Sequence, residues 1–260
     1  MDLGLEGKEV LITGGSKGIG LALAHAFAAE GARIIMVSRT QAVLEAAAGD
    51  VARKHNAKVR AHAADLADAA QRRQLQQTFP EVDILINNAG AIPGGGIADV
   101  SLEVWQQAWA LKVFGYIHLC QLYVAAMKQR QAGTIVNIIG MGGRAVRPDY
   151  ICGAAGNGGL IAFTQALGAE TPNYNVRVFG INPAATMTDR IVALSKQRAR
   201  TRFDDESRWR EALGEDKLPF GRIKSAAEVA ALATMLCAPQ VHYLSGTVID
   251  MDGGGQWRTA

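Results

Sequence analysis

Short runs of β-branched residues alternate along this chain with longer segments that have helical spacing. The runs are Glu9–Ile12, Arg33–Val37, Lys58–His62, Val82–Ile86, Thr134–Ile139, Val176–Ile181 and Thr247–Asp250. The segments between them are Gly20–Glu30, Gln41–Asn56, Ala67–Phe79, Leu102–Arg130, Gly158–Glu170 and Ala226–Cys237. Most runs are apolar with little alternation, as in strands buried on both faces of a parallel sheet. The pattern predicts an α/β fold with a doubly wound parallel sheet and helices on both faces.

Composition limits the partners that such a fold would serve. The chain has 260 residues, 49% of them apolar, and no linker-like stretch, so a single domain over residues 1–260 is predicted. Its net charge is only +3 and it has no dense run of Lys or Arg, so no nucleic acid is expected as a partner. No unbroken apolar run approaches the ~20 residues that cross a bilayer, so no membrane association is expected.

The three cysteines, Cys120, Cys152 and Cys237, are far apart in the sequence. Their spacing indicates neither a metal site nor a disulfide framework. Isolated thiols are typical of a reducing compartment, and the N-terminal residues lack the pattern of a secretory signal. A cytoplasmic protein without a bound metal is therefore expected.

Residues 187–218 interrupt the alternation with a polar segment. Its basic residues include Arg190, Lys196, Arg198, Arg200, Arg202, Arg208 and Arg210, set among acids. The segment follows the carboxyl end of a predicted strand, where ligands bind in open α/β sheets. One interpretation is a lid over a substrate, with the arginines favouring an anionic one. The other is a solvated helical excursion whose faces carry salt bridges.

A glycine-rich turn follows the first predicted strand and opens the first helix. It reads Thr13-Gly14-Gly15-Ser16-Lys17-Gly18-Ile19-Gly20. Glycines let the backbone approach a pyrophosphate, and the N–H groups and partial positive charge of a helix N-terminus favour phosphate there. Because the turn lies between a strand and a helix, it strongly indicates a dinucleotide site.

This turn, as Thr-Gly-x-x-x-Gly-x-Gly, resembles the short-chain dehydrogenase/reductase family. Asn87-Asn88-Ala89-Gly90 after the fourth strand, Asn182-Pro183 after the sixth and Asp250–Gly254 after the last are also similar to that family. The resemblance covers nearly the whole chain. It implies a Rossmann-type fold with a seven-stranded parallel sheet, a nicotinamide cofactor, a small-molecule substrate and a homo-oligomer, either a dimer or the usual homotetramer.

The resemblance also assigns cofactor contacts by position. Residues expected at the pyrophosphate are Gly14, Ser16, Lys17, Gly18, Ile19 and Gly20. Residues expected around the adenosine are Asp65, Leu66, Asn88, Ala89 and Gly90. Residues whose backbone is expected to hold the nicotinamide carboxamide are Pro183, Ala184, Thr186 and Thr188. The family often has Gly where this chain has Ala184.

The end of the second predicted strand distinguishes the two dinucleotides. Members that use NAD usually have an acid there, whereas this chain has Ser38, Arg39 and Thr40. Arg39 and Lys17 would supply two cations for a 2′-phosphate, so NADP(H) is predicted in preference to NAD(H). The alternative is a solvated arginine after a strand.

The family's catalytic pattern is a Tyr-x-x-x-Lys pair, a Ser thirteen residues before the Tyr and an Asn on the preceding long helix. In the family the Tyr transfers a proton and the Lys lowers its pKa and bonds the ribose, while the Ser holds the substrate oxygen and the Asn helps a water relay. Here Leu160–Thr164 matches the family's helix, which puts Asn157 at the Lys position and Gly153 at the Tyr position.

Two further anchors support this register. Val136-Asn137-Ile138 matches the strand before the family's Ser and puts Gly140 at the Ser position, thirteen residues before 153. Lys112-Val113-Phe114-Gly115 matches the family's Asn-x-x-Gly and puts Lys112 at the Asn position. A lysine and an asparagine therefore look exchanged. We expect Lys112 to supply the ammonium and Asn157 to bond the ribose hydroxyls. The alternative is a surface lysine and a helix-start asparagine.

Tyr150 lies three residues before the family's Tyr position. It is a candidate acid/base, if its hydroxyl swings into the space left by the two glycines. The alternative is an aromatic side chain packed under the lid. Cys152 has no adjacent histidine to activate it, so it is not expected to be a nucleophile.

These features predict an NADP(H)-dependent oxidoreductase that acts on a small carbonyl or alcohol substrate through a non-standard site. Its catalytic candidates are Lys112, Tyr150 and Asn157. A placed nicotinamide provides the hydride chemistry, and the protein adds positioning and proton management. One alternative is a redox-neutral enzyme, isomerase- or lyase-like, that retains bound NADP(H). The other is a non-catalytic nucleotide-binding sensor or partner subunit.

Overall fold

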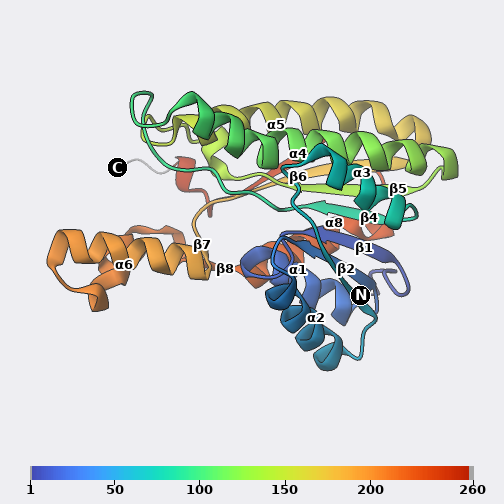
Figure 1. Ribbon diagram of the computed structural model, residues 1–260, viewed down its shortest axis with the longest axis horizontal. Coiled ribbons are helices and arrows are strands. Elements are labelled where there is room, and N and C mark those ends of the chain that lie inside the picture. Colours follow the sequence, from blue (N-terminus) through green and yellow to red (C-terminus); the bar gives the residue numbers. More distant parts are fainter. Residues whose placement is uncertain (1, 258–260) are drawn as a thin grey trace.

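The computed structural model of the chain describes residues 2–257. Its main sheet has seven parallel strands in the order β3-β2-β1-β4-β5-β6-β9 (Figure 1). The strands are β1 (Glu9–Thr13), β2 (Arg33–Ser38), β3 (Val59–Ala63), β4 (Ile84–Asn87), β5 (Gly133–Ile138), β6 (Val176–Pro183) and β9 (Val248–Met251). A separate two-stranded sheet pairs β7 (Thr186–Met187) with β8 (Lys224–Ser225). The predicted Rossmann-type sheet is confirmed.

Helices cover both faces of the main sheet, with α1, α2 and α8 on one face and α3, α4 and α5 on the other (Figure 1). They are α1 (Gly18–Ala29), α2 (Gln41–His55), α3 (Ala69–Thr78), α4 (Leu102–Arg130), α5 (Ile151–Glu170) and α8 (Ala226–Cys237). Strand β1 shows why its sequence lacks alternation. Val10 and Ile12 pack in the core on the α1 side, and Leu11 packs in the core on the α4 side. Both faces of the strand are buried, so both must be apolar.

Helix α5 begins seven residues earlier than the sequence predicts, at Ile151 rather than Gly158. Glycines in its first turns lower the intrinsic helix propensity by about 1 kcal/mol each, which hides this part of the helix in the sequence. Packing explains why Gly156 is there. A Cβ at this position would lie 3.0 Å from Val113 Cγ2 and 3.2 Å from Trp109 Nε1 of α4. The close approach of α4 and α5 therefore overrides propensity.

Helix α4 has the bounds that the sequence predicts. The Ser101 hydroxyl caps its N-terminus by accepting from the Val104 N–H, and Gln131 ends it in the left-handed conformation. Within residues 2–257 it is the one helix whose length and mean hydropathy would allow a membrane span, and 44% of that window is buried inside the protein. A helix that covers a sheet face passes the same test, and residues of α4 such as Tyr123 and Met127 pack in the core against the sheet.

The 187–218 segment is helical and projects away from the main sheet (Figure 1). It contains α6 (Asp189–Phe203) and α7 (Trp209–Leu213), which pack on each other. Three of its arginines, Arg200, Arg208 and Arg210, pair with acids of the same segment. Arg200 lies 2.5 Å from Glu206, and Arg208 donates two hydrogen bonds to Glu211. The solvated, salt-bridged excursion accounts for these charges, and the role of the segment as a lid stays a prediction.

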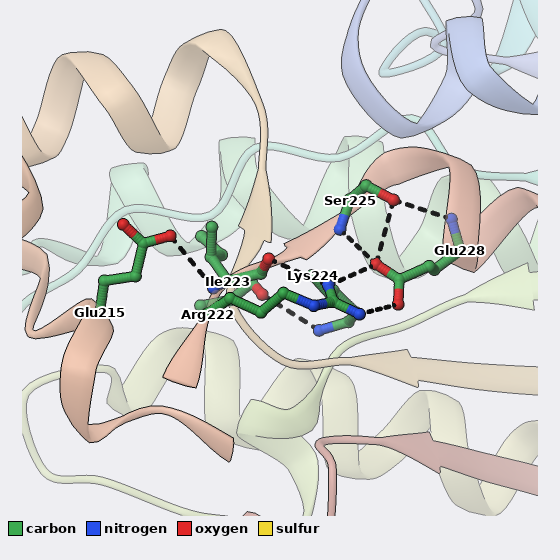
Figure 2. Close-up of polar contacts among 7 residues, drawn as sticks. Glu215, Arg222, Ile223, Lys224, Ser225 and Glu228 are labelled. Carbon is green, nitrogen blue, oxygen red and sulfur yellow. Dashed lines mark hydrogen bonds and ion pairs between the residues drawn. The ribbon is translucent and has the colours of Figure 1, made fainter. Parts of the chain in front are cut away.

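The chain returns from this segment to the body through a polar cluster before α8 (Figure 2). Arg222 donates to both carboxylate oxygens of Glu228, at 2.9 and 2.8 Å. This pairing lowers the pKa of Glu228 to about 2. Glu228 also accepts from the Ser225 N–H and completes a capping box with it. The cluster fixes where α8 begins and where the segment ends.

Candidate functional site

Two adjoining cavities open at the carboxyl ends of the central strands. We call them the Arg39 cavity, of about 450 Å³, and the Lys112 cavity, of about 430 Å³. Both are lined by Gly14, Lys17, Ala89, Gly90 and Arg190. They meet between β1 and β4, where the strand order reverses. Open α/β sheets bind ligands at this switch point.

The Arg39 cavity carries three cations. Lys17, Arg39 and Arg190 line it, and none of its lining residues within the described part of the chain is acidic. Other residues predicted to contact the cofactor that line it are Ser16, Ser38 and Leu66. A cavity with this charge favours a polyanionic ligand.

Asp65 lies apart from the two cavities, although its neighbour Leu66 lines one of them. Its Oδ1 accepts from the Ala67 N–H at 3.0 Å, and its own N–H donates to Gln71 Oε1 at 2.7 Å. The carboxylate thus holds the turn that leads into α3. The structure supports a structural role for Asp65. Leu66 lines the Arg39 cavity, and its contact with the adenine stays a prediction.

The glycine-rich turn adopts the backbone that its sequence predicts. Gly14 and Gly18 have φ of +67° and +54°, in the left-handed region that favours glycine. Gly20 lines neither cavity, because it lies in α1 and packs against the Gly14 carbonyl, which a Cβ would overlap. Gly20 therefore shapes the site by letting α1 approach the turn.

A threonine joins the two turns that form the cavity floor. The Thr13 hydroxyl accepts from the Asn88 N–H at 2.8 Å and the Ala89 N–H at 3.0 Å, and donates to the Ile86 carbonyl at 3.3 Å. Asn88 Nδ2 in turn donates to the Thr13 carbonyl at 2.9 Å. These bonds hold the turn after β1 against the turn after β4.

The Lys112 cavity extends from the glycine-rich turn to the end of β6. Its residues predicted to contact the cofactor are Gly14, Lys17, Gly18, Ile19, Asn88, Ala89, Gly90, Lys112, Pro183, Ala184, Thr186 and Thr188. Gly140 lines it as well, at the end of β5. The predicted carboxamide-binding backbone and the predicted catalytic lysine therefore share one cavity.

Lys112 is buried, with 8% of its surface exposed. Its Nζ donates to the Ile138 carbonyl at 2.6 Å and to the Tyr116 hydroxyl at 3.0 Å, and that hydroxyl donates to the same carbonyl at 3.0 Å. Gly90 makes room for the lysine, because a Cβ there would lie 2.5 Å from Lys112 Cδ. The alternative interpretation of a surface lysine is wrong.

Burial lowers the pKa of Lys112 to about 7. The cause is desolvation, which penalises the charged amine, and no carboxylate of the described chain offsets it. An amine in this state is present in both protonation forms near neutral pH.

Asn157 is buried in α5, with 3% of its surface exposed. It lies in the second turn of that helix, so the alternative of a helix-start asparagine is wrong. Its Nδ2 lies 3.3 Å from where a Cβ at Gly140 would be. Among the described residues, none bonds its Oδ1. Lys112 and Asn157 therefore approach the end of β5 from two different helices, although Asn157 lines neither cavity.

Tyr150 lies at the start of α5 with its ring folded back over that helix. A Cβ at Gly153 would overlap the ring and lie 2.5 Å from its hydroxyl oxygen. A Cβ at Gly142 would lie 2.8 Å from its Cε1. Burial raises the pKa of Tyr150, with Arg190 and a side-chain hydrogen bond with Asn157 acting in the opposite direction. The ring thus lies at the predicted Tyr position, yet it does not line either cavity.

The neighbours of Tyr150 have structural roles. Cys152 is fully buried, and burial raises the pKa of its thiol, which opposes formation of a nucleophilic thiolate. Trp109 Nε1 donates to the Cys152 carbonyl at 3.2 Å. Asp149 lies 3.2 Å from Arg147. Within residues 2–257, no cluster of His, Cys, Asp or Glu has the arrangement of a metal site.

Sequence reasoning missed two residues of this site. Tyr116, which bonds Lys112, lies four residues after it on α4, and this helical spacing was the available signal. Arg190 lines both cavities and donates to the Ile92 carbonyl at 3.2 Å, but in the sequence it was one of several arginines in the 187–218 segment. Its position two residues after Thr188 was the sign that it belongs to the site.

Known proteins share this architecture along the whole chain. Residues 8–199 match the family described as short chain dehydrogenase. Galactitol 2-dehydrogenase (L-tagatose-forming) of Cereibacter sphaeroides is 31% identical over 252 residues, which are 96% of this chain and 95% of that protein. D-beta-hydroxybutyrate dehydrogenase of Cupriavidus necator is 31% identical over 255 residues, which are 96% and 98% of the two chains.

A solved structure extends the likeness to three dimensions. The crystal structure of L-sorbose reductase from Gluconobacter frateurii, complexed with NADPH and L-sorbose, matches with a TM-score of 0.92 at 30% identity and covers 100% of both chains. The sequence similarity extends from end to end, and it agrees with the sheet order, the glycine-rich turn and the switch-point cleft described above. This chain therefore belongs to the short chain dehydrogenase family of oxidoreductases.

Proposed function

We propose that this chain is an NADP(H)-dependent oxidoreductase that interconverts a small alcohol and its carbonyl, through a site that departs from the family pattern. The observation that carries the proposal is the continuous cleft from Arg39 to Lys112. One end holds cations without an acid, and the other holds a buried amine. Relatives named for galactitol and L-sorbose support a sugar- or polyol-like substrate.

The residues of the cleft fit a phosphorylated dinucleotide. Lys17 and Arg39 would pair with the 2′-phosphate, and the N-terminus of α1 would face the pyrophosphate. Backbone from Pro183 to Thr188 would hold the carboxamide. A nicotinamide bound there supplies or accepts the hydride. Gly14 and Gly18, both with positive φ, give the turn the backbone path that such a ligand needs.

The side chains at the Lys112 end would position the ligand and manage protons. Asn157 Oδ1 is a buried acceptor without a partner among the described residues, which suits it to a hydroxyl donor of a ribose or of Tyr150. Glycine at 140 and 153 removes the hydroxyl and the phenol of the family pattern. Lys112 then provides a buried cationic donor in the cavity that Gly140 lines.

The 187–218 segment fits a lid in this proposal. It begins at the cleft, because Thr188, Asp189 and Arg190 line the Lys112 cavity. Its outer part packs on itself rather than on the main sheet. A movement about its start would bring a polar face over the substrate without disturbing the core.

Steady-state assays with NADPH test the function. We expect oxidation of NADPH with L-sorbose or another ketose, and reduction of NADP⁺ with galactitol or D-3-hydroxybutyrate in the reverse direction. Product formed without a change in NADPH would instead indicate the redox-neutral enzyme. Tight NADPH binding without product from any of these compounds would favour the nucleotide sensor. Absence of binding would contradict the proposal as a whole.

A further inference from the structure

The Lys112 side chain has a hydrogen-bonding arrangement that leaves one donor for a ligand. An ammonium has three N–H groups. Two of them meet the Tyr116 hydroxyl and the Ile138 carbonyl, and Lys112 itself lines the cavity that contains Gly140. Among the described residues no third acceptor meets the amine, and Lys112 borders the cavity at the end of β5, which the family's Ser position, Gly140, also lines.

Tyr116 suits an amine that changes its protonation state. Its hydroxyl now accepts from Lys112 and donates to the Ile138 carbonyl. When the amine loses its proton, the same hydroxyl can rotate and donate to the nitrogen lone pair, because a hydroxyl serves as donor or acceptor. Tyr116 is 1% exposed, and burial raises its own pKa well above the ordinary value, so it stays a neutral phenol.

The other ionisable groups near this cavity are poorly placed or unsuited. Among the described lining residues they are Lys17, Asp189 and Arg190. Lys17 belongs to the glycine-rich turn, and Asp189 is exposed at the first residue of α6. The guanidinium of Arg190 does not give up its proton in proteins. The Tyr150 hydroxyl lies against Gly153, and Tyr150 lines neither cavity.

We infer that Lys112 is the group that exchanges a proton with the oxygen of the bound carbonyl or alcohol, and that Tyr116 positions it. This inference rests on the proposed function. In reduction, the Lys112 ammonium gives one proton to the carbonyl oxygen while the carbonyl carbon receives the hydride of a reduced nicotinamide. The products are the alcohol, the oxidised nicotinamide and a neutral amine, which solvent reprotonates. In oxidation, the neutral amine takes the proton of the alcohol.

The electrostatics of the cavity agree with this role. A group whose pKa lies near the working pH transfers protons in both directions most effectively. Burial brings Lys112 into that range. The charged groups that line the same cavity are Lys17, Asp189 and Arg190, and Tyr116 is the titratable group in direct contact. A bound 2′-phosphate lies at the far end of the cleft, so Lys112 is expected to remain titratable in the loaded enzyme.

The Lys112 protonation state can be observed without turnover. We would follow the lysine ¹³Cε resonances of labelled full-length protein against pH, with and without NADPH, and assign Lys112 by its loss in Lys112→Met. The expected midpoint is near neutral pH. In Tyr116→Phe it should fall by about one pH unit, because the hydroxyl stabilises the ammonium, through a charge-assisted bond, more than it stabilises the neutral amine. A midpoint near the ordinary value of about 10.4 overturns the inference.

Kinetics with NADPH and L-sorbose, or the most active ketose, give the second arm. Lys112→Met should lower kcat by about 100-fold or more, a larger factor than the weakening of NADPH binding measured by fluorescence. In Tyr116→Phe the midpoint of the pH profile of kcat should shift in the same direction as the ¹³Cε midpoint, and by the same amount. Tyr150→Phe should lower kcat less than Lys112→Met and leave that midpoint in place. A midpoint that moves with Tyr150→Phe and not with Tyr116→Phe overturns the inference. If the wild type does not bind NADPH, the proposed function is contradicted. The Lys112 titration without NADPH would still test the state of the amine.

Discussion

The ring of Tyr150 fills the space that any side chain at Gly153 would occupy. The two residues lie less than one helical turn apart at the start of α5. A Cβ at Gly142 would also crowd the ring, at 2.8 Å from its Cε1 and 2.9 Å from its Cδ1. Glycine at 153 therefore has a packing role in this chain, in addition to marking where the family pattern has tyrosine.

Gly153→Ala tests this packing. The new Cβ overlaps the Tyr150 ring, so the ring must move from its described position. We expect a loss of about 1–3 kcal/mol in the free energy of unfolding, as for other overpacked sites. Urea unfolding followed by circular dichroism measures it.

Gly159→Ala is the matched control, because it lies in the same helix and a Cβ there meets nothing within 4 Å. It should stabilise the protein by up to about 1 kcal/mol. In a Tyr150→Ala background the cost of Gly153→Ala should disappear. A Gly153→Ala protein as stable as Gly159→Ala would contradict the described ring position.

Thr13 holds together the two turns under the cleft, and its hydroxyl is the shared acceptor of two N–H groups. Thr13→Ala leaves both N–H groups without that partner. We expect a loss of about 1–3 kcal/mol in unfolding free energy and weaker NADPH binding. Thr13→Ser keeps the hydroxyl and should retain both properties. Calorimetry of unfolding and fluorescence titration with NADPH, applied to both variants, would show whether the contact between the two turns depends on the hydroxyl.

Arg39 is expected to decide which dinucleotide binds. Arg39→Ala removes one of the cations that line its cavity and leaves Lys17 in place. The Kd for NADPH should rise by about 10- to 100-fold, the range of a charge-assisted hydrogen bond, while the Kd for NADH changes little. For Arg39→Lys, the Kd for NADPH should lie between the values of the wild type and of Arg39→Ala. Equal weakening of both dinucleotides would assign Arg39 to the adenine rather than to a 2′-phosphate.

Lys112 also makes stability depend on pH. Its folded-state pKa of about 7 lies below the ordinary lysine value of 10.5, so the unfolded chain binds more protons between these two pH values. Below about pH 7 the full free-energy cost of burying the Lys112 ammonium therefore opposes folding. This cost declines as pH rises toward 10.5. The wild type should gain about 2 kcal/mol relative to Lys112→Met between pH 7 and pH 9. Urea unfolding of both proteins at the two pH values gives this difference, in which other titrating groups cancel. A difference that stays constant with pH would mean that Lys112 titrates normally.

The main features of the fold were predictable because they follow from burial. Strands such as β1 are apolar on both faces, and α4 and α8 have the bounds that periodicity predicts. The start of α5 was not predictable in this way. Its glycines oppose helix formation locally, and only the contact with α4 and the Tyr150 ring explains them.

The sequence predicts those residues of the site whose position follows directly from the alternation of strands and helices. The glycine-rich turn and Arg39 follow directly from the end of a strand, and both line the cleft. The state of Lys112 was not readable from the sequence, because its burial and its bond to the Ile138 carbonyl depend on how α4 packs on β5. The place of Tyr150 likewise depends on a tertiary contact that spacing alone does not show.

A crystal structure of the protein with NADPH and a bound ketose would test the account most directly. We predict that Lys112 Nζ lies within hydrogen-bond distance of the ketose oxygen, with the Tyr116 hydroxyl behind it and the Tyr150 ring still against Gly153. A structure in which the Tyr150 hydroxyl contacts the ketose oxygen, and Lys112 bonds only protein groups, would contradict it.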